Sequence, residues 1–459
     1  MIGYLLLAIV LFAVVAYFTG RTAGNRFVAS NGAAVHSLPG YHGAFVAIWV
    51  GIPALVLVLL WTALQGTVID SLLVGTLPAA MTEGASRADI SLFLSEIKNV
   101  AAGRIFAEPT PEIAAAAETF LRWQGIAGWA MVVVALTVMV IALFLAQSRL
   151  SPRFRARTGV ERFVSGFMIM CALIAVFVTI GIIASLLFES FEFFKFVPVH
   201  EFFFGLRWEP QIAIRADQVA GNGAFGAVPV FLGTLVISVI AMVVAVPIGI
   251  FTAIYLVEYA SDTLRNIVKP VLEILAGIPT VVFGFFAVLT VAPAVRSAGG
   301  LIGITTSPNS ALAAGLVMGI MIIPFVSSLA DDALLAVPRS MRDGSLALGS
   351  TRAETMTRVL LPAALPGIMG GVLLALSRAI GETMIVVMAA GLIATLNINP
   401  LDSVTTVTVQ IVSLLIGDTS FDSPKTLAAF ALGLVLFLVT LGLNVIALTI
   451  VRRFREQYE

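Results

Sequence analysis

The stretch of sequence from residue 228 to residue 256 reads VPVFLGTLVISVIAMVVAVPIGIFTAIYL and contains no charged side chain. A helix of about 20 predominantly apolar residues is long enough to cross the hydrocarbon core of a bilayer. Eight further stretches share this character: residues 2–18, 43–63, 125–146, 163–188, 272–293, 310–329, 364–390 and 426–451. None alternates polar with apolar residues as the strands of a membrane barrel do. We therefore expect an all-α integral membrane protein with about nine transmembrane helices.

The overall composition supports this fold class. Of the 459 residues, 59% are hydrophobic and 11% are charged, whereas about a quarter of a soluble domain is charged. The 26 basic residues balance the 26 acidic ones, which argues against a nucleic-acid partner. The single cysteine, Cys171, excludes an intrachain disulfide, and the three histidines have no Cys or Glu neighbour at ligand spacing. We expect no metal site.

The distribution of basic residues predicts the orientation. If the C-terminal tail is cytoplasmic, the inside segments carry 16 lysines and arginines and the outside segments carry 9. This asymmetry predicts an outside N-terminus and a cytoplasmic C-terminus. No basic residue precedes the first span and no small-residue cleavage pattern follows it, so we expect it to be retained as an anchor.

The chain changes character near residue 160. Three spans precede this point, in residues 1–160, with an outside loop at 64–124, and six spans follow it, in residues 163–459. Residues 189–225 place seven phenylalanines, between positions 191 and 204, beside charged neighbours and predict an amphipathic helix in the membrane interface. No activity can be derived for residues 1–160, for which we expect an anchoring or assembly role.

The longest inside loop, residues 330–363, carries helix signals. Pro338 is suited to the first turn of a short helix and Gly349 to its end, while Thr351 with Glu354 predicts a capping box that starts another helix. That second helix should end near Pro362. Leu346 and Leu348 give the loop an apolar face, which suggests docking into a partner. The alternative is a helical hairpin packed on its own bundle.

The eighth span contains two ionisable residues, Arg378 and Glu382. A charged group inside a membrane is expensive and is a functional candidate. Four residues apart, the two share one face of a helix. The arginine fork suits oxyanions, and the carboxylate favours an oxyanion that still carries a proton, as phosphate does and sulfate does not. The alternatives are a purely structural ion pair or a proton relay. Thr383 is a further candidate ligand.

Other residues have structural explanations. We expect Glu273 to cap a helix or to pair with Lys269, four residues earlier. Pro247, Pro279 and Pro324 are expected to interrupt their spans.

At two places the sequence resembles a family. The spacing of Asp343, Gly349 and Val359-Leu-Leu-Pro362 is similar to the cytoplasmic loop of ABC importer permeases. Here Asp343-Gly-Ser345 stands where the family usually has Glu-Ala-Ala, and Val359 stands where it has Ile. In that family the loop is the coupling helix that inserts into the ATPase. The resemblance implies these coupling residues: Asp343, Gly344, Ser345, Gly349, Val359, Leu361 and Pro362.

The second segment, Arg378-Ala-Ile-Gly-Glu382-Thr-Met384, is similar to that of phosphate-uptake permeases of the PstC type. The resemblance extends from about residue 163 to the C-terminus. It implies a type I ABC importer permease core of six spans, preceded by an N-terminal membrane extension, in the bacterial inner membrane. Its implied substrate is inorganic phosphate, with Arg378, Glu382 and Thr383 in the pathway. The implied partners are a PstA-like second permease, an ATPase dimer and an outside phosphate-binding protein.

ATP hydrolysis is expected on a partner. A phosphate-binding loop of the Walker type needs a Gly-Lys pair, and none of the four lysines follows a glycine. We therefore expect no enzyme activity and no bound cofactor in this chain, with ATP-Mg on the partner ATPase. Two alternatives stay open: an ion-coupled secondary transporter in which Arg378 and Glu382 relay protons, and a membrane signalling protein.

Overall fold

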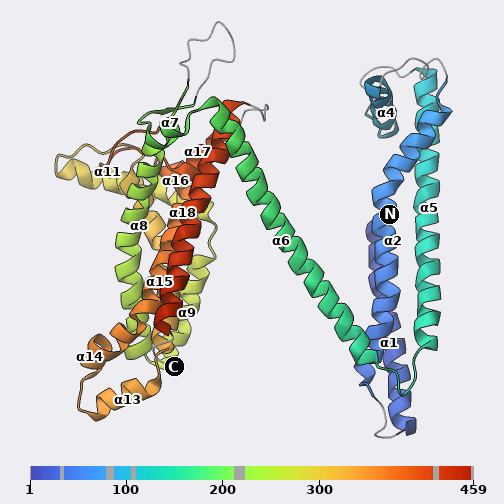
Figure 1. Cartoon of the computed structure of the whole chain (residues 1–459), viewed down its shortest axis with the longest axis horizontal. Helices are drawn as coiled ribbons and strands as arrows, with labels where there is room; N and C mark the ends of the chain where they lie inside the picture. The colour runs from blue at the N-terminus through green and yellow to red at the C-terminus, as the bar shows by residue number, and fades with distance from the viewer. Residues whose placement is uncertain are drawn as a thin grey trace. The chain divides into compact units, whose positions relative to one another are not determined.

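The computed structural model describes residues 2–31, 36–78, 87–104, 110–210, 223–416 and 423–455. Within these ranges nine helices are long and apolar enough to cross a membrane, which confirms the expected all-α membrane fold. The chain divides into two compact units, Met1–Phe177 and Val178–Glu459, which we call the N-terminal unit and the C-terminal unit. Figure 1 shows the helices of each unit.

The N-terminal unit is built on three long helices, α1 (Ile2–Asn31), α2 (Pro39–Thr76) and α5 (Pro111–Ser148). Glycines let α1 and α2 approach closely, since a Cβ on Gly20 would lie 2.8 Å from the carbonyl oxygen of His42. The amphipathic helix α4 (Arg87–Ala101) covers α2 and α5 through a small apolar cluster. The expected outside loop at 64–124 is therefore largely helical, and its residues 79–86 and 105–109 lie outside the described ranges.

The long helix α6 (Ala156–Phe196) contains the boundary between the two units. It is followed by α7 (Val199–Phe204) and by the short antiparallel pair β1 (Trp208–Glu209) and β2 (Ala224–Phe225). Phe193, Phe202, Trp208 and Phe225 are buried together in one apolar cluster. Residues 189–209 thus form the end of α6, α7 and β1 rather than the single amphipathic helix expected. Phe193 and Phe202 are buried, whereas Phe191, Phe196, Phe203 and Phe204 stay exposed, and residues 211–222 lie outside the described ranges.

The rest of the C-terminal unit is a helical bundle. Its elements are α8 (Val228–Ile254), the π-helical turn η2 (Tyr255–Tyr259), α9 (Asp262–Ala276), α10 (Thr280–Phe286), η3 (Ala287–Val291), α11 (Ala292–Leu301), α12 (Ala311–Leu335), α13 (Arg339–Ala347), α14 (Arg352–Thr355), η4 (Met356–Leu360), α15 (Leu361–Ile380), α16 (Met384–Ala389), α17 (Val407–Leu415) and α18 (Pro424–Arg455).

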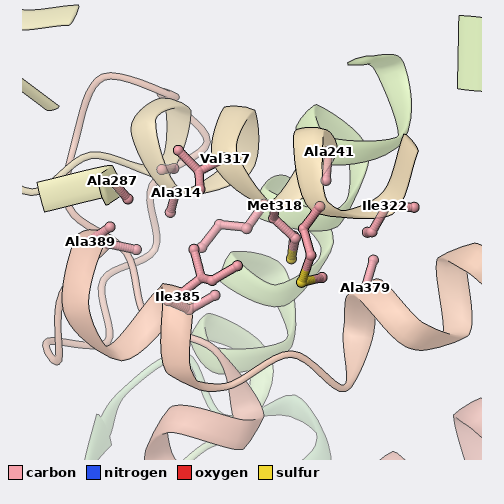
Figure 2. Close-up of a cluster of buried hydrophobic side chains, with 14 of the residues drawn as sticks. Ala241, Ala287, Ala314, Val317, Met318, Ile322, Ala379, Ile385 and Ala389 are labelled. Atoms are coloured by element: carbon pink, nitrogen blue, oxygen red, sulfur yellow. The ribbon is translucent and has the colours of Figure 1, made fainter. Parts of the chain in front are cut away.

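The centre of this bundle is α12, which packs against α8, α15 and α16. Figure 2 shows Val317, Met318 and Ile322 of α12 meeting small residues of the neighbouring helices, such as Ala241 of α8 and Ala379 of α15. Glycines again permit the close approach, because a Cβ on Gly319 would lie 2.9 Å from the Val244 side chain. The packing fixes the position of α12 relative to α15, which matters for the site.

Three sequence predictions about the spans are corrected. The sixth span is Thr280–Leu301 rather than 272–293, since the chain breaks after Ala276 and Pro279 precedes the new helix. Pro247 and Pro324 lie inside continuous helices, so the interruption expected at each is wrong. Neighbouring groups in a bundle can satisfy the carbonyl that a proline leaves free. The eighth span ends at Ile380, not at residue 390.

Candidate functional site

Arg378 lies in the last turn of α15, beside the middle of α12. The two helices are antiparallel, since a Cβ on Gly367 would touch Ala333 and one on Gly371 would touch Leu329, each at 2.8 Å. Continued along α15, this register places Arg378 level with Ile322, about one turn of α12 from Phe325. The guanidinium carbon lies 5.7 Å from the centroid of the Phe325 ring, within the range of a cation–π contact.

Arg378 lines a cavity of about 280 Å³ between α9, α12 and α15, which we call the α9–α12–α15 cavity. Ionisable and hydroxyl side chains make up half of its wall, and they are Lys269, Glu273, Ser327, Ser328, Asp331 and Arg378. The arginine side chain is exposed, and in the described part of the chain no carboxylate forms an ion pair with it. The cavity therefore offers an uncommitted guanidinium beside two hydroxyls.

A buried carboxylate with two cations forms one end of this cavity. Asp331 is 3% exposed, and its oxygens accept hydrogen bonds from Nη2 of Arg265 at 2.9 and 3.1 Å and from Nζ of Lys269 at 2.8 Å. Two partners compensate the loss of solvation of the carboxylate and leave the cluster with a surplus positive charge. Lys269 thus pairs with Asp331 on α12, and the expected pair with Glu273 is wrong.

Glu382 does not pair with Arg378, so that prediction is also wrong. Helix α15 ends at Ile380, and Oε1 of Glu382 accepts hydrogen bonds from the N–H groups of Met384 and Ile385, at 3.0 and 3.5 Å. A carboxylate at this place satisfies free donors at the start of α16 and interacts favourably with its dipole. The carbonyl of Glu382 also accepts a hydrogen bond from Oγ1 of Thr408 at 2.8 Å.

Thr383 is likewise outside the cavity wall. Its hydroxyl donates to the carbonyl oxygen of Gly381 at 3.4 Å. The structure therefore brings Arg378 to the cavity, while Glu382 and Thr383 form the connection from α15 to α16.

The expected helix, turn and helix are present in the 330–363 loop. Helix α13 follows Pro338, Gly349 adopts a φ of +88°, and Thr351 and Glu354 form a reciprocal capping box. The expected end near Pro362 is wrong. Pro362 occupies the first turn of α15, where a proline needs no hydrogen-bond partner, and the helix continues into the membrane.

The two faces of α13 differ. Leu346 and Leu348 are 37% and 90% exposed, Asp343 is exposed, and a Cβ on Gly344 would meet nothing within 4 Å. By contrast, Oγ of Ser345 lies 3.0 Å from Oγ1 of the buried Thr355. The other residues of the expected coupling set are Gly349, in the turn after α13, and Val359, Leu361 and Pro362, later in the loop. Gly349 and Pro362 are exposed, and Val359 and Leu361 are half-buried.

Figure 1 places α13 and α14 at the same end of the C-terminal unit as the end of α18. An apolar side chain as exposed as Leu348 on a polar loop is a feature of docking surfaces. The loop therefore combines a face bonded to its own bundle with a face open to a partner.

Sequence reasoning missed most of the cavity. Ser327, Ser328 and Asp331 lie in the C-terminal half of α12, whereas the sequence predicts Asp331 in a loop. A signal did exist, because Arg265 and Lys269 stand four residues apart on an amphipathic helix and need an acidic partner. In the described ranges no group of His, Cys, Asp and Glu gathers as metal ligands.

Comparisons with known proteins match both parts of the chain. A family model described as a phosphate ATP-binding cassette transporter matches residues 6–178, and one described as a binding-protein-dependent transport system inner membrane component matches residues 245–456. A probable ABC transporter permease protein of Bacillus subtilis, YqgH, is 33% identical over 284 residues, covering 60% of this chain and 87% of the relative.

Two further relatives are phosphate transport system permease proteins. PstC 1 of Mycobacterium tuberculosis is 35% identical over 277 residues, covering 55% of this chain and 81% of the relative. PstC of Mesorhizobium japonicum is 33% identical over 241 residues, covering 49% and 72%. Among solved structures, an inward-facing MetNI methionine ABC transporter matches with a TM-score of 0.36 and 20% identity, covering 49% of this chain and 94% of that chain.

Proposed function

Since the chain belongs to the PstC-type family of phosphate ABC transporter permeases, as a transmembrane permease subunit, we propose that it forms the route by which inorganic phosphate crosses the bacterial inner membrane. The observation that carries this proposal is the uncommitted Arg378 in the α9–α12–α15 cavity, in the last turn of a membrane-spanning helix. A charged side chain inside a membrane span is costly, by about 2.5–3.5 kcal/mol at the centre of the span. A bound oxyanion in the cavity compensates that cost.

The chemistry of the cavity fits phosphate. The planar fork of Arg378 holds two oxygens of a tetrahedral anion, and the hydroxyls of Ser327 and Ser328 add neutral hydrogen bonds. Lys269 and Arg265 supply further positive charge next to Asp331. The cavity therefore attracts an anion, but it does not hold the anion by cations alone. Such binding suits a substrate that must also be released.

We assign the discrimination against sulfate to Glu273. Glu382 is committed to the start of α16, whereas Glu273 is exposed and lines the cavity with Arg378. A carboxylate beside a bound oxyanion is repulsive unless the anion donates a proton, which phosphate has near neutral pH and sulfate lacks. Replacing Glu273 by Gln should therefore let sulfate compete with phosphate uptake; unchanged sulfate insensitivity would remove Glu273 from selectivity.

The coupling part of the proposal rests on α13. With its exposed Leu346 and Leu348, α13 docks on a cytoplasmic ATPase dimer, which binds ATP-Mg and carries out hydrolysis. Asp343, Gly344 and Gly349 lie on the open side of the loop, and Ser345, Val359, Leu361 and Pro362 connect it to the bundle. With α13 on the cytoplasmic side, the proposal gives the chain a cytoplasmic C-terminus and, for the nine spans of the described residues, an outside N-terminus.

A PstA-like second permease and an outside phosphate-binding protein complete the proposed importer. For residues 1–160 we propose an anchoring or assembly role. The proton-relay alternative loses its support, because Arg378 and Glu382 form no ion pair in the described structure and the carboxylate is bonded to backbone N–H groups.

The proposal is tested by labelled phosphate uptake at low external phosphate, in cells with and without the chain. We expect uptake that requires the chain and ATP and is unaffected by excess sulfate. Uptake that survives ATP depletion but stops when the proton gradient is dissipated would contradict an ABC importer and favour a secondary transporter.

A further inference from the structure

Glu258 is a fully buried acid that neither lines the α9–α12–α15 cavity nor belongs to α13, so the proposed function gives it no role. It lies in η2, the π-helical turn that continues α8, and its side chain is 0% exposed. Its Oε1 accepts a hydrogen bond from Nη2 of Arg342 at 3.1 Å, and Arg342 belongs to α13. The other oxygen, Oε2, has no hydrogen-bond partner among the residues that the structure describes.

A second polar contact attaches the same face of α13 to the bundle. Ser345 stands three residues after Arg342, so the two side chains lie on one face of the helix. Its hydroxyl meets that of Thr355, which is buried just before η4. Helix α13 is thus bonded to the bundle at two points, while the side chain of Leu348, directly after its last residue, stays exposed.

The Arg342–Glu258 pair connects α13 to the wall of the α9–α12–α15 cavity. Leu256, two residues before Glu258 in η2, lines that cavity. The preceding helix α8 is closely packed along α12, where a Cβ on Gly249 would lie 2.8 Å from Val326. A displacement of α13 therefore reaches the cavity through η2 and α8 without passing through the flexible turn at Gly349.

The energetics argue against a purely stabilising role. A buried ion pair is often no more stabilising than apolar residues of the same volume, although removing one partner is strongly destabilising. π-helical turns inside helices occur frequently at functional sites. Here Glu258 lies in the π-helical turn η2, and Thr355 is the last residue of α14, directly before the π-helical turn η4.

We propose that the Arg342–Glu258 ion pair is the connection by which α13 moves α8 against α12, which makes Glu258 and Arg342 positioning residues for the coupling of ATP hydrolysis to transport. This inference rests on the proposed function. Without the pair, α13 still docks on the ATPase, but its movement is no longer transmitted to η2 and Leu256.

The test uses the complete transporter, this chain with its second permease, ATPase subunits and binding protein, in proteoliposomes. The variants are Arg342→Gln, Glu258→Gln, the double variant and Arg342→Lys, with Arg296→Gln as a control that removes an exposed arginine from α11. Three quantities are measured for each: the amount of assembled complex, the rate of ATP hydrolysis, and the phosphate taken up per ATP hydrolysed.

Arg342→Gln should lower the amount of complex, because it leaves the Glu258 carboxylate buried without a cation. The double variant should recover that amount, since no charge remains. It should nevertheless take up at least about tenfold less phosphate per ATP. A factor of this size is typical of the coupling between two sites in a protein. Arg342→Lys, which keeps the cation, and Arg296→Gln should both take up about as much phosphate per ATP as the unaltered transporter.

A double variant that assembles and transports with the normal ratio would overturn the inference, because the pair would then be only structural. A double variant no more abundant than Arg342→Gln would overturn the premise that Arg342 compensates Glu258. Absence of ATP-dependent phosphate uptake by the unaltered transporter would instead overturn the proposed function itself.

Discussion

The guanidinium of Arg378 lies over the face of the Phe325 ring, with 5.7 Å between the guanidinium carbon and the ring centroid. A ring face attracts the cation without occupying its N–H groups, which remain available to an anion. A carboxylate in the position of the ring would instead accept hydrogen bonds from these N–H groups, and they would not be available to an anion. The contact therefore leaves the donors of Arg378 available to the anion that we propose it binds.

Replacing Arg378 by Gln should abolish most phosphate uptake while the transporter still assembles. A hydrogen bond to a charged group contributes about 1.5–3 kcal/mol, so the loss of the fork should reduce uptake by at least about tenfold. Arg378→Lys keeps the positive charge but not the planar fork of donors. Its phosphate uptake should therefore lie between that of Arg378→Gln and that of the unaltered transporter. Labelled uptake and copurification of the subunits measure both effects; normal uptake in Arg378→Gln would remove the arginine from the pathway.

Glu382→Ala should act on stability rather than on substrate binding. The carboxylate accepts hydrogen bonds from the N–H groups of Met384 and Ile385, and loss of such a cap costs about 0.5–2 kcal/mol. We expect a lower midpoint in thermal unfolding of the purified transporter, with an unchanged KM for phosphate in the fraction that is folded. Glu382→Asp, which keeps a carboxylate, is the matched control. A raised KM at unchanged thermal stability would contradict the capping role.

Asp331→Asn should destabilise the C-terminal unit strongly. The change leaves Arg265 and Lys269 facing each other without their shared carboxylate, which is 3% exposed. Loss of one partner from a buried pair costs about 3–5 kcal/mol, and we expect the lower end because both cations keep some exposure. The neighbouring Asp332 is exposed, so Asp332→Asn makes the same chemical change as a control. Equal thermal stability of the two variants would show that the cluster is not structurally important.

Leu348→Asp should release the ATPase without unfolding the chain. This leucine is 90% exposed on the 330–363 loop, and a central apolar anchor of an interface contributes about 2 kcal/mol or more. We expect at least about tenfold less ATPase to copurify. Leu301 is 89% exposed and is the last residue of α11, a helix that lies at the opposite end of the unit from α13 (Figure 1), so Leu301→Asp provides the control. Equal loss of ATPase in both variants would contradict docking through α13.

Structural features that depend only on residues close together in the sequence could be predicted. The nine spans follow from local hydropathy, because the bilayer requires each apolar segment to satisfy its own backbone. The elements of the 330–363 loop follow from Pro338, Gly349 and the Thr351–Glu354 box, whose hydrogen bonds join residues three apart. For the same reason Arg378 could be singled out as a candidate site residue, because a charged side chain is rare inside a span.

Properties that depend on distant residues were not predictable. Asp331 takes Arg265 and Lys269 as partners from 66 and 62 residues away, and Glu258 takes Arg342 from 84 residues away. The expected pair of Arg378 and Glu382 required a continuous helix, but Thr408 and the first turn of α16 bind Glu382 instead.

The sequence alone therefore determined the membrane fold, the number of spans in the described residues and the two short helices of the 330–363 loop, because hydropathy and helix capping act over a few residues. Only the tertiary structure decided which charges pair, which stay free and which groups line the cavity. The partner of a buried charge is the group that packing brings within hydrogen-bond reach, and in this chain the packing of α9, α12 and α15 makes that choice.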